Sequence, residues 1–363
     1  MSTWPKVPLG ELAKPKQWPT LSKLEMMESG FPVYGANGRI GYYNTFTHEK
    51  PTILIGCRGS CGTVHVTEPK SYANGNAMAL DELDETRVNL SFLVQFFRQR
   101  GFRDVISGTS QPQIIRQNIV RVEIPLPPLA EQRQIAQVLD RAEALQANRQ
   151  AALDQLDSLN QSIFLDLFGN PATNPKGWPH KTLFDLGKVV TGGTPPSAKA
   201  GMFDGSIPFV TPGDLESDEP VKRSLTAAGA EESRTVRAGA TLVCCIGATI
   251  GKMGIAPVRS AFNQQLNAVE WFSGVDDHYG YATLRFFKPT IKSWGASTTL
   301  PILKKSSFEK IEIPVPPLSL QQEFARRFQA TEKLRVSQKK SLMAINELFT
   351  SLQDRAFRGE IKL

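Results

Sequence analysis

The chain contains the same sequence pattern twice. Residues 122–129 read V-E-I-P-L-P-P-L and residues 311–318 read I-E-I-P-V-P-P-L, which is an offset of 189 positions (318 − 129 = 189). At this offset the copies match without a gap from Thr52, which aligns with Thr241, through to Phe168. A duplication of this size predicts two equivalent structural units. Two related sites suit a ligand that is itself repeated or two-fold, and duplex DNA is the prime candidate.

The composition is that of an ordinary globular protein with more basic than acidic residues. The 363 residues are 40% hydrophobic and 21% charged, and the net charge of +7 favours a polyanionic partner. This length predicts about two or three domains. The N-terminal sequence lacks the apolar segment of a secretory signal, and no apolar run approaches the ~20 residues of a membrane span. The four cysteines are sparse, which indicates a cytoplasmic protein.

Each copy begins with a globular part rich in glycine, proline and short β-branched segments. The predicted strands are 52–55, 120–124, 241–244 and 310–313, and the predicted short helices are 91–100 and 281–287. The double proline ends the last strand of each copy. Short strands with few helices indicate an α+β fold made of two α/β heads.

A long helix follows each proline motif. Residues 129–168 contain neither glycine nor proline, and Gly169 ends the segment; the second copy runs from 318 to 357 and ends at Gly359. Apolar residues recur at spacings that are largely three or four, at Ile135, Leu139, Ala142, Leu145, Leu153, Leu156, Ile163 and Leu167. Forty residues at ~1.5 Å each would span about 60 Å. Because the second helix must run back toward the first head, the two helices are predicted to form an antiparallel coiled coil with a pseudo-two-fold axis.

The pattern divides the chain into four parts. Residues 1–128 are the first head, 129–170 the first spacer helix, 171–317 the second head and 318–363 the second spacer helix. The early offsets are smaller, since Trp4 to Trp178 gives 174 and Pro32 to Pro208 gives 176. The second head should therefore contain an insertion of 13 to 15 residues (189 − 176 = 13; 189 − 174 = 15), which we place within residues 214–233.

Signatures of catalysis are lacking. Residues 247–253, G-A-T-I-G-K-M, resemble a phosphate-binding loop, but three residues separate the glycines instead of four, and Met253 replaces the required Ser or Thr. The four histidines are scattered. Cys57 and Cys61 have no second Cys/His pair at ligand spacing, so buried strand residues are favoured over metal ligands. The sequence predicts a binding protein without a cofactor or metal rather than an enzyme.

The heads carry side chains suited to DNA contact. Asn and Gln can pair with adenine edges, Arg with guanine, and Ser or Thr with bases or phosphates. Asn37-Gly38 is a hairpin signal that would display its neighbours on a compact loop. The candidates in the first head are Tyr34, Asn37, Arg39, Tyr42, Arg58, Ser60, Asn74, Asn76, Ser110 and Gln111. Those in the second head are Thr211, Thr249, Lys252, Asn263, Gln264, Gln265, Thr298 and Thr299.

These motifs give the chain a family resemblance. Y-G-A-N-G-R-I-G-Y at 34–42, G-C-R-G-S-C-G-T-V at 56–64, T-G-G-T-P-P-S at 191–197 and G-A-T-I-G-K at 247–252 resemble target-recognition domains of type I restriction–modification specificity subunits. The proline motif followed by a glutamine-rich helix is similar to that family's spacer region. The resemblance covers the whole chain in the family's order of head, helix, head and helix.

The resemblance implies a non-catalytic, sequence-specific subunit that binds double-stranded DNA. Each head would read one half of a bipartite target, and the helices would set the spacer and dock two DNA methyltransferase subunits. Restriction subunits can join such a complex, and no membrane is involved. Two alternatives stay open: a specificity subunit of a type IIB-like or other methylation-based defence system, and a two-headed scaffold that binds proteins instead of DNA.

Overall fold

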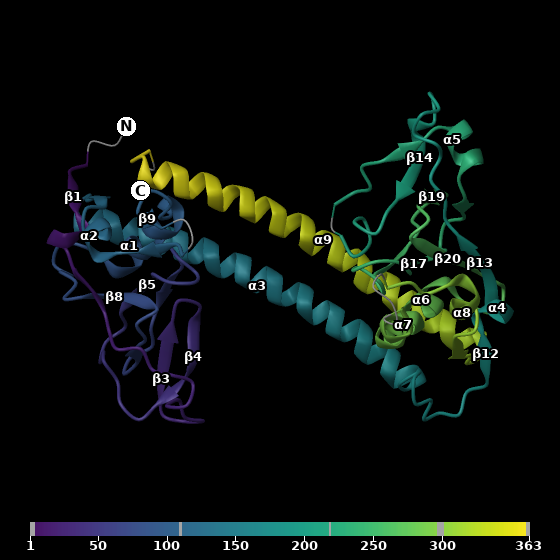
Figure 1. The fold of residues 1–363 in the computed structure, drawn as a ribbon, viewed down its shortest axis with the longest axis horizontal. Helices are drawn as coiled ribbons and strands as arrows, with labels where there is room; N and C mark the ends of the chain where they lie inside the picture. The colour runs from purple at the N-terminus through teal and green to yellow at the C-terminus, as the bar shows by residue number, and fades with distance from the viewer. Residues whose placement is uncertain (1–3, 109–110, 218, 296–300, 361–363) are drawn as a thin grey trace. The chain divides into compact units, whose positions relative to one another are not determined.

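The computed structural model describes residues 4–108, 111–217, 219–295 and 301–360 (Figure 1). Three predicted contact residues, Ser110, Thr298 and Thr299, lie outside the described residues. The chain forms two compact units, unit 1 from Met1–Ala151 and Lys339–Leu363, and unit 2 from Ala152–Gln338. Within the described part of the chain, no helix has both the length and the apolar character needed to cross a membrane.

Head 1, the globular part before the first long helix, is built on small sheets. Its elements are β1 (Lys6–Pro8), β2 (Lys14–Gln17), β3 (Phe31–Gly35), β4 (Gly38–Tyr43), β5 (Ile53–Gly56), β6 (Val64–Val66), β7 (Tyr72–Ala73), β8 (Ala77–Asp81), α1 (Leu90–Arg100), β9 (Ile106–Ser107), β10 (Gln113–Ile114), α2 (Arg116–Ile119) and β11 (Glu123–Pro125), with a short 3-10 helix at Leu9–Glu11. One sheet has the order β2-β8-β5-β6 and another the order β4-β3-β7. β1 pairs with β11, which ties the start of the chain to the proline motif.

Head 2, the globular part between the long helices, repeats this plan with additions. Its elements are β12 (His180–Thr182), α4 (Leu183–Leu186), β13 (Gly187–Thr191), β14 (Phe203–Val210), β15 (Ser224–Leu225), α5 (Ala227–Glu232), β16 (Thr235–Val236), β17 (Thr241–Cys244), β18 (Met253–Ile255), β19 (Ser260–Phe262), β20 (Leu266–Trp271), α6 (Asp277–Phe286), α7 (Lys288–Gly295), α8 (Lys305–Phe308) and β21 (Glu312–Pro314). Its sheets have the orders β13-β20-β17-β18 and β15-β14-β19-β16, and β12 pairs with β21.

The two long helices begin and end at the predicted residues. They are α3 (Leu129–Phe168) and α9 (Leu318–Phe357), each of 40 residues. Gly169 and Gly359 follow their last turns with φ of +75° and +71°, a backbone conformation that side chains with a Cβ disfavour. The predicted strand 120–124 was wrong in its first part, because Arg116–Ile119 forms a helical turn and the strand starts only at Glu123.

The helices pair antiparallel inside each unit. In unit 1, Gln146 Nε2 in the first half of α3 donates to Asn346 Oδ1 in the second half of α9, at 2.9 Å. In unit 2, Thr331 Oγ1 early in α9 donates to Asn160 Oδ1 late in α3. In both units the first half of one helix thus lies against the second half of the other, which confirms the predicted direction.

The predicted apolar stripe is only partly buried. Ile135, Leu139 and Leu153 are in the core, but Leu145 is 54% exposed and its counterpart Leu334 is 55% exposed. The hydrophobic core instead contains aromatic residues near the helix ends, such as Phe164, which is 1% exposed. The three-and-four spacing therefore predicted the helix correctly but assigned Leu145 to the wrong face.

Strand pairing corrects the gapless repeat. Leu54 pairs with Ala79, whereas Leu242 pairs with Ala268, so β8 maps to β20 at an offset of 189 (268 − 79) while β5 maps to β17 at 188 (242 − 54). Thr52 is therefore not equivalent to Thr241. The extra residue lies in the following loop, where three residues separate the glycines Gly247 and Gly251, against two between their counterparts in head 1.

The insertion in head 2 lies between β14 and β17, a segment that includes the predicted residues 214–233, but it is shorter than the predicted 13 to 15 residues. Val33 pairs with Tyr72 and Phe209 pairs with Ala261 in the same parallel arrangement, which fixes an offset of 176 at β14 (209 − 33 = 176). The offset then rises to 188 at β17, so twelve residues are inserted between these strands (188 − 176 = 12). This segment contains β15, which pairs with β14 as β4 pairs with β3, then α5, and then β16, which adds the fourth strand to the second sheet.

Candidate nucleic-acid interface

Loops of head 1 are joined by hydrogen bonds into one surface. The Thr63 hydroxyl donates to the carbonyl of Ala36, which joins the β3–β4 turn to the loop after β5. The Cys57 N–H donates to Asn76 O at 3.0 Å, and the Ile114 N–H donates to Cys57 O at 3.0 Å. The loop before β8 and the strand β10 therefore both meet the loop after β5, although they are far apart in the sequence.

Most of the predicted contact residues of head 1 lie on this surface, but two are buried. Asn37, Arg39, Arg58, Asn76 and Gln111 are exposed, and Tyr42 and Ser60 are half-buried. Tyr34 is 8% exposed and Asn74 is 2% exposed, so the expectation that the loops display them is wrong. Asn74 Nδ2 donates to Leu21 O at 3.3 Å, which makes it part of the packing beneath the loops.

Arg39 is held by neighbouring side chains of the β3–β4 hairpin and the loop after β6. Its guanidinium lies 5.7 Å from the ring centroid of Tyr42 and 3.6 Å from Glu68 Oε1. Tyr34 supports the carboxylate from below, because its hydroxyl donates to Glu68 Oε1 at 2.9 Å. Burial, reinforced by this hydrogen bond, raises the pKa of the Tyr34 hydroxyl, so the hydroxyl keeps its proton and stays a donor.

Head 2 joins its loops by the same main-chain bonds. The Cys245 N–H donates to Gln265 O at 2.8 Å, and the Leu303 N–H donates to Cys245 O at 2.8 Å. A further loop joins them, since Thr194 Oγ1 donates to Gln264 Oε1 at 2.6 Å. Thr194 was not among the predicted contact residues, although it lies in the 191–197 motif.

The predicted residues of head 2 are less exposed than those of head 1. Gln264 is exposed, whereas Thr211, Thr249, Lys252, Asn263 and Gln265 are half-buried. Four of these side chains are already engaged. Thr211 Oγ1 donates to Asp214 Oδ2 at 2.6 Å, Asn263 Nδ2 donates to Gln265 Oε1 at 3.1 Å, and Thr249 Oγ1 lies 3.4 Å from Cys244 Sγ. These bonds shape the loops, as Asx and Ser/Thr side chains commonly do.

The two heads present equivalent loops with different side chains. Arg58 and Gln113 form an isolated antiparallel β-bridge through their backbones in head 1. Ile246 and Ile302 form the equivalent β-bridge in head 2. A charged and polar pair in one head is thus replaced by an apolar pair in the other. The backbone of the surface is common to the heads, while its chemistry is not.

Two lysines near the head 2 loops were not predicted from the sequence. A Cβ at Gly251 would lie 3.2 Å from Lys288 Cγ and 3.3 Å from Lys292 Cγ, which places the start of α7 against this loop. Lys288 is paired with Glu216 at 2.6 Å. The only sequence signal for them is the spacing of four between two lysines on one helix face.

Cys57, Cys244 and Cys245 are buried, whereas Cys61 is half-buried in the loop between β5 and β6, so the prediction of a buried strand residue is wrong for Cys61. Burial raises the pKa of Cys245 to about 12, and the pKa of Cys57 is raised for the same reason, which keeps both thiols protonated. Among the described residues, no group of three or more His, Cys, Asp or Glu side chains is placed to hold a metal ion.

One glutamine in each copy fastens the long helix to its head. The buried Gln132 side chain accepts from the Asn89 N–H at 2.8 Å and donates to the carbonyls of Arg87 and Pro127, both at 2.9 Å. Gln321 makes the same three kinds of contact in unit 2. In each copy the glutamine oxygen accepts from the N-cap residue of a shorter helix. That residue is Asn89, the N-cap of α1, in unit 1 and Asp276, the N-cap of α6, in unit 2. The sequence repeat marked these glutamines, but their role was not predicted.

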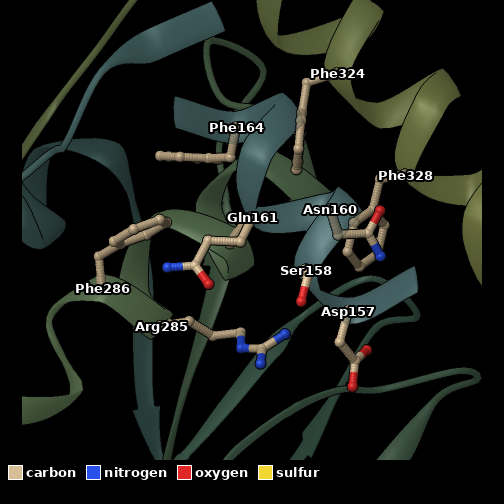
Figure 2. Close-up of a pocket in the computed structure, with 10 residues that line it drawn as sticks. Asp157, Ser158, Asn160, Gln161, Phe164, Arg285, Phe286, Phe324 and Phe328 are labelled. Carbon is tan, nitrogen blue, oxygen red and sulfur yellow. The ribbon is translucent and has the colours of Figure 1, made fainter. Parts of the chain in front are cut away.

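A pocket of about 260 Å³ lies in unit 2 beside both long helices. Its walls include Phe164, Phe286, Phe324 and Phe328, together with Arg285 and Gln161. Figure 2 shows Arg285 across the pocket from Phe164 and Phe324. The aromatic side is tightly packed, since Phe164 stacks on Phe286 at 4.8 Å between ring centroids. The other side is polar, with Asp157, Ser158 and Asn160 beside Arg285 and Gln161, so the pocket offers both apolar and hydrogen-bonding contacts.

Comparison with known proteins shows the family. A model described as "Type I restriction modification DNA specificity domain" matches residues 1–156 and again residues 175–346. The chain therefore belongs to the type I restriction–modification specificity family and contains two copies of its domain. This confirms the resemblance drawn from the loop and proline motifs.

Individual relatives are distant but extend along the chain. The type I restriction enzyme MjaIX specificity subunit of Methanocaldococcus jannaschii is 24% identical over 340 residues, covering 86% of this chain and 78% of the relative. The HindI specificity subunit of Haemophilus influenzae is 25% identical over 198 residues, covering 52% of this chain and 42% of the relative. A crystal structure of the S subunit of a type I restriction–modification system from M. genitalium matches with a TM-score of 0.72 at 17% identity, over 98% of this chain and 96% of that chain. The predicted fold class, two α/β heads with two long antiparallel helices, is confirmed.

Proposed function

We propose that this chain is the DNA-reading subunit of a type I complex, and that each head binds one half of a bipartite target. The observation that carries the proposal is the repeated loop surface, built on one backbone plan with different side chains in the two heads. Two copies of one surface suit two half-sites of a duplex, and different side chains suit two different half-site sequences. We assign the heads to residues 1–128 and 171–317, and the spacer helices to 129–170 and 318–363.

The long helices are proposed to dock two methyltransferase subunits and to set the length of unread DNA. Both long helices expose leucines in each unit. They are Leu145 and Leu348 in unit 1, and Leu159, Leu165, Leu318 and Leu334 in unit 2, all between 36% and 58% exposed. Apolar side chains repeated on a helix surface favour a partner helix. The repeat supplies two such surfaces, which supports two docked copies, and the pocket of Figure 2 adds a further opening in unit 2.

The isolated chain is expected to have no methyltransferase, nuclease or ATPase activity. The reason is that its sequence contains no nucleophile set or phosphate-binding loop that meets the required spacing. Incubation of the purified chain with DNA, labelled S-adenosylmethionine and ATP measures this. Methyl transfer by the chain alone would contradict the proposal that it is non-catalytic.

Exchange of head 1 tests the proposal directly. Residues 1–128 should be exchanged as one block, because β1 pairs with β11 through Lys6 opposite Pro125 and a shorter exchange would separate these strands. With a methyltransferase subunit present, the exchanged protein is expected to modify a target with one new half-site and one unchanged half-site. Sequencing of methylated bases in host DNA measures both halves at once.

The matched control is the exchange of residues 171–317, which should change only the other half-site. A change of both half-sites after either exchange would show that the heads do not read independently. Absence of any methylated motif, together with binding that ignores salt, would favour a protein scaffold, because DNA contacts release counterions and weaken as salt rises.

A further inference from the structure

The Arg39 side chain of head 1 is restrained by a chain of contacts that begins in the interior. Tyr34 and Arg39 lie opposite each other on β3 and β4, where the ladder shifts register between Val33 and Tyr34. The Tyr34 hydroxyl donates to Glu68 Oε1 at 2.9 Å, and the same oxygen lies 3.6 Å from Arg39 Nη1. The buried phenol therefore fixes a carboxylate, and the carboxylate faces a guanidinium on the surface.

The contact with Glu68 places the Arg39 guanidinium without burying it, so Arg39 stays available to a ligand. The side chains of Arg39 and Glu68 are 52% and 57% exposed, and exposed ion pairs contribute little to stability. Guanidinium has five N–H donors in a rigid fork, so contact with one carboxylate oxygen leaves donors for a second acceptor. A guanine edge, with its O6 and N7 acceptors, matches that fork. A phosphate oxygen approaching the same place would meet the Glu68 carboxylate and be repelled.

We propose that Glu68 is a specificity-determining positioning residue, which holds Arg39 for a guanine edge and discourages its use on phosphate. This inference rests on the proposed function, since it takes the loop surface of head 1 as the DNA-facing one. It assigns Tyr34 the role of fixing Glu68 instead of contacting DNA. Glu68 itself acts through Arg39.

Head 2 does not repeat this arrangement. The pairing of β14 places Val210 where head 1 has Tyr34 (210 − 34 = 176), and the sequence offset places Pro257 where head 1 has Glu68 (257 − 68 = 189). The arrangement of Tyr34, Glu68 and Arg39 is therefore confined to head 1, so its removal should affect one half-site only. That restriction gives the experiment an internal control.

The experiment uses the full chain in complex with its methyltransferase subunits. Three variants are compared with the unaltered complex: Glu68→Gln, Tyr34→Phe and Arg39→Ala. The readouts are base preference at each target position, from methylated-base sequencing, and binding to matched and random duplexes over a salt series. Glu82→Gln is the matched control, because Glu82 is also an exposed glutamate of head 1 in an ion pair, with Lys14, at 65% exposure.

Glu68→Gln is expected to relax the preference for guanine at one position of the first half-site by roughly five- to a hundred-fold. It should also bind random duplex more tightly, with a salt slope steeper by ~0.9 for one added phosphate contact. Tyr34→Phe should relax the same position without a change of charge. Glu82→Gln should leave the base preference unaltered, which separates positioning from a general effect of charge.

A double variant decides whether Glu68 acts through Arg39. With Arg39→Ala in place, Glu68→Gln should cause no further loss of preference at that position. The inference is overturned if Glu68→Gln keeps the preference, if Arg39→Ala leaves it intact, or if Glu68→Gln relaxes it equally in both backgrounds. Failure of the proposed function looks different, because the unaltered complex would then modify no bipartite target at all. Since Glu68 is exposed, its variant should fold even where Tyr34→Phe destabilises the head.

Discussion

Replacement of Gln321 by leucine is expected to lower the free energy of unfolding of unit 2 by roughly 2–5 kcal/mol. Gln321 is fully buried, and its side chain accepts from the Asp276 N–H at 2.9 Å and donates to the carbonyls of Pro316 at 2.8 Å and Gly274 at 3.3 Å. Leucine has a similar volume but no polar atom, so one amide and two carbonyl groups would lose their partner. Each such buried group costs about 1–3 kcal/mol, and partial solvation of the Gly274 carbonyl reduces the total.

Urea unfolding followed by circular dichroism measures the loss. The matched control is Gln322→Leu, since Gln322 is the next residue of the same helix and is exposed. The equivalent change in the other copy, Gln132→Leu, should destabilise unit 1 to a similar extent because Gln132 makes the same contacts. Equal stability of Gln321→Leu and Gln322→Leu would show that the glutamine does not anchor the helix.

The long helices could be predicted from the sequence because their signals are local. A stretch of 40 residues without glycine or proline, with apolar residues at helical spacing, leaves few other structures for the chain. A glycine in the left-handed region then ends each helix. What the spacing could not reveal is which face is buried: Leu145 fits the stripe but is exposed, because the interior at that level is decided by the partner helix.

The register of β17 could not be predicted because the sequences favour a different answer. Alignment of Thr52 with Thr241 avoids a gap, yet the ladder places Leu242 against Ala268 and so moves the strand by one residue. A shift of one residue exchanges the two faces of a strand, so packing decides it. The added residue falls between Gly247 and Gly251, where a loop can accept it.

The candidate interface was predictable as loops but not side chain by side chain. Motifs with glycine and asparagine mark turns, and the turns do gather on one surface of each head. Tyr34 and Asn74 are buried by tertiary contacts instead: the Tyr34 hydroxyl donates to Glu68, and Asn74, in the loop between β7 and β8, donates to Leu21 O. The support of Arg39 by Glu68 joins residues 29 positions apart (68 − 39), which no local pattern indicates.

The second large effect is expected when both long helices are lengthened together by four residues. The insertions belong between Ala151 and Ala152 in α3 and between Gln338 and Lys339 in α9, where the chain passes from one unit to the other. Contacts inside each unit fix the helix pairing on either side, as with Gln146 and Asn346 in unit 1. A matched pair of insertions keeps the register of both units, whereas an insertion in α3 alone forces one unit out of register.

Four residues add ~6 Å at ~1.5 Å each and slightly more than one turn. Six ångströms is nearly two base pairs at ~3.4 Å, which a stiff duplex does not absorb over a short site. The double insertion should therefore abolish modification of the original target and produce one whose spacer is longer by one or two base pairs, with both half-sites unchanged. Methylated-base sequencing reads spacer and half-sites together. The insertion in α3 alone is the control and should lose bipartite recognition, while an unchanged spacer in the double insertion would mean that the docked subunits, and not the helices, set the spacing.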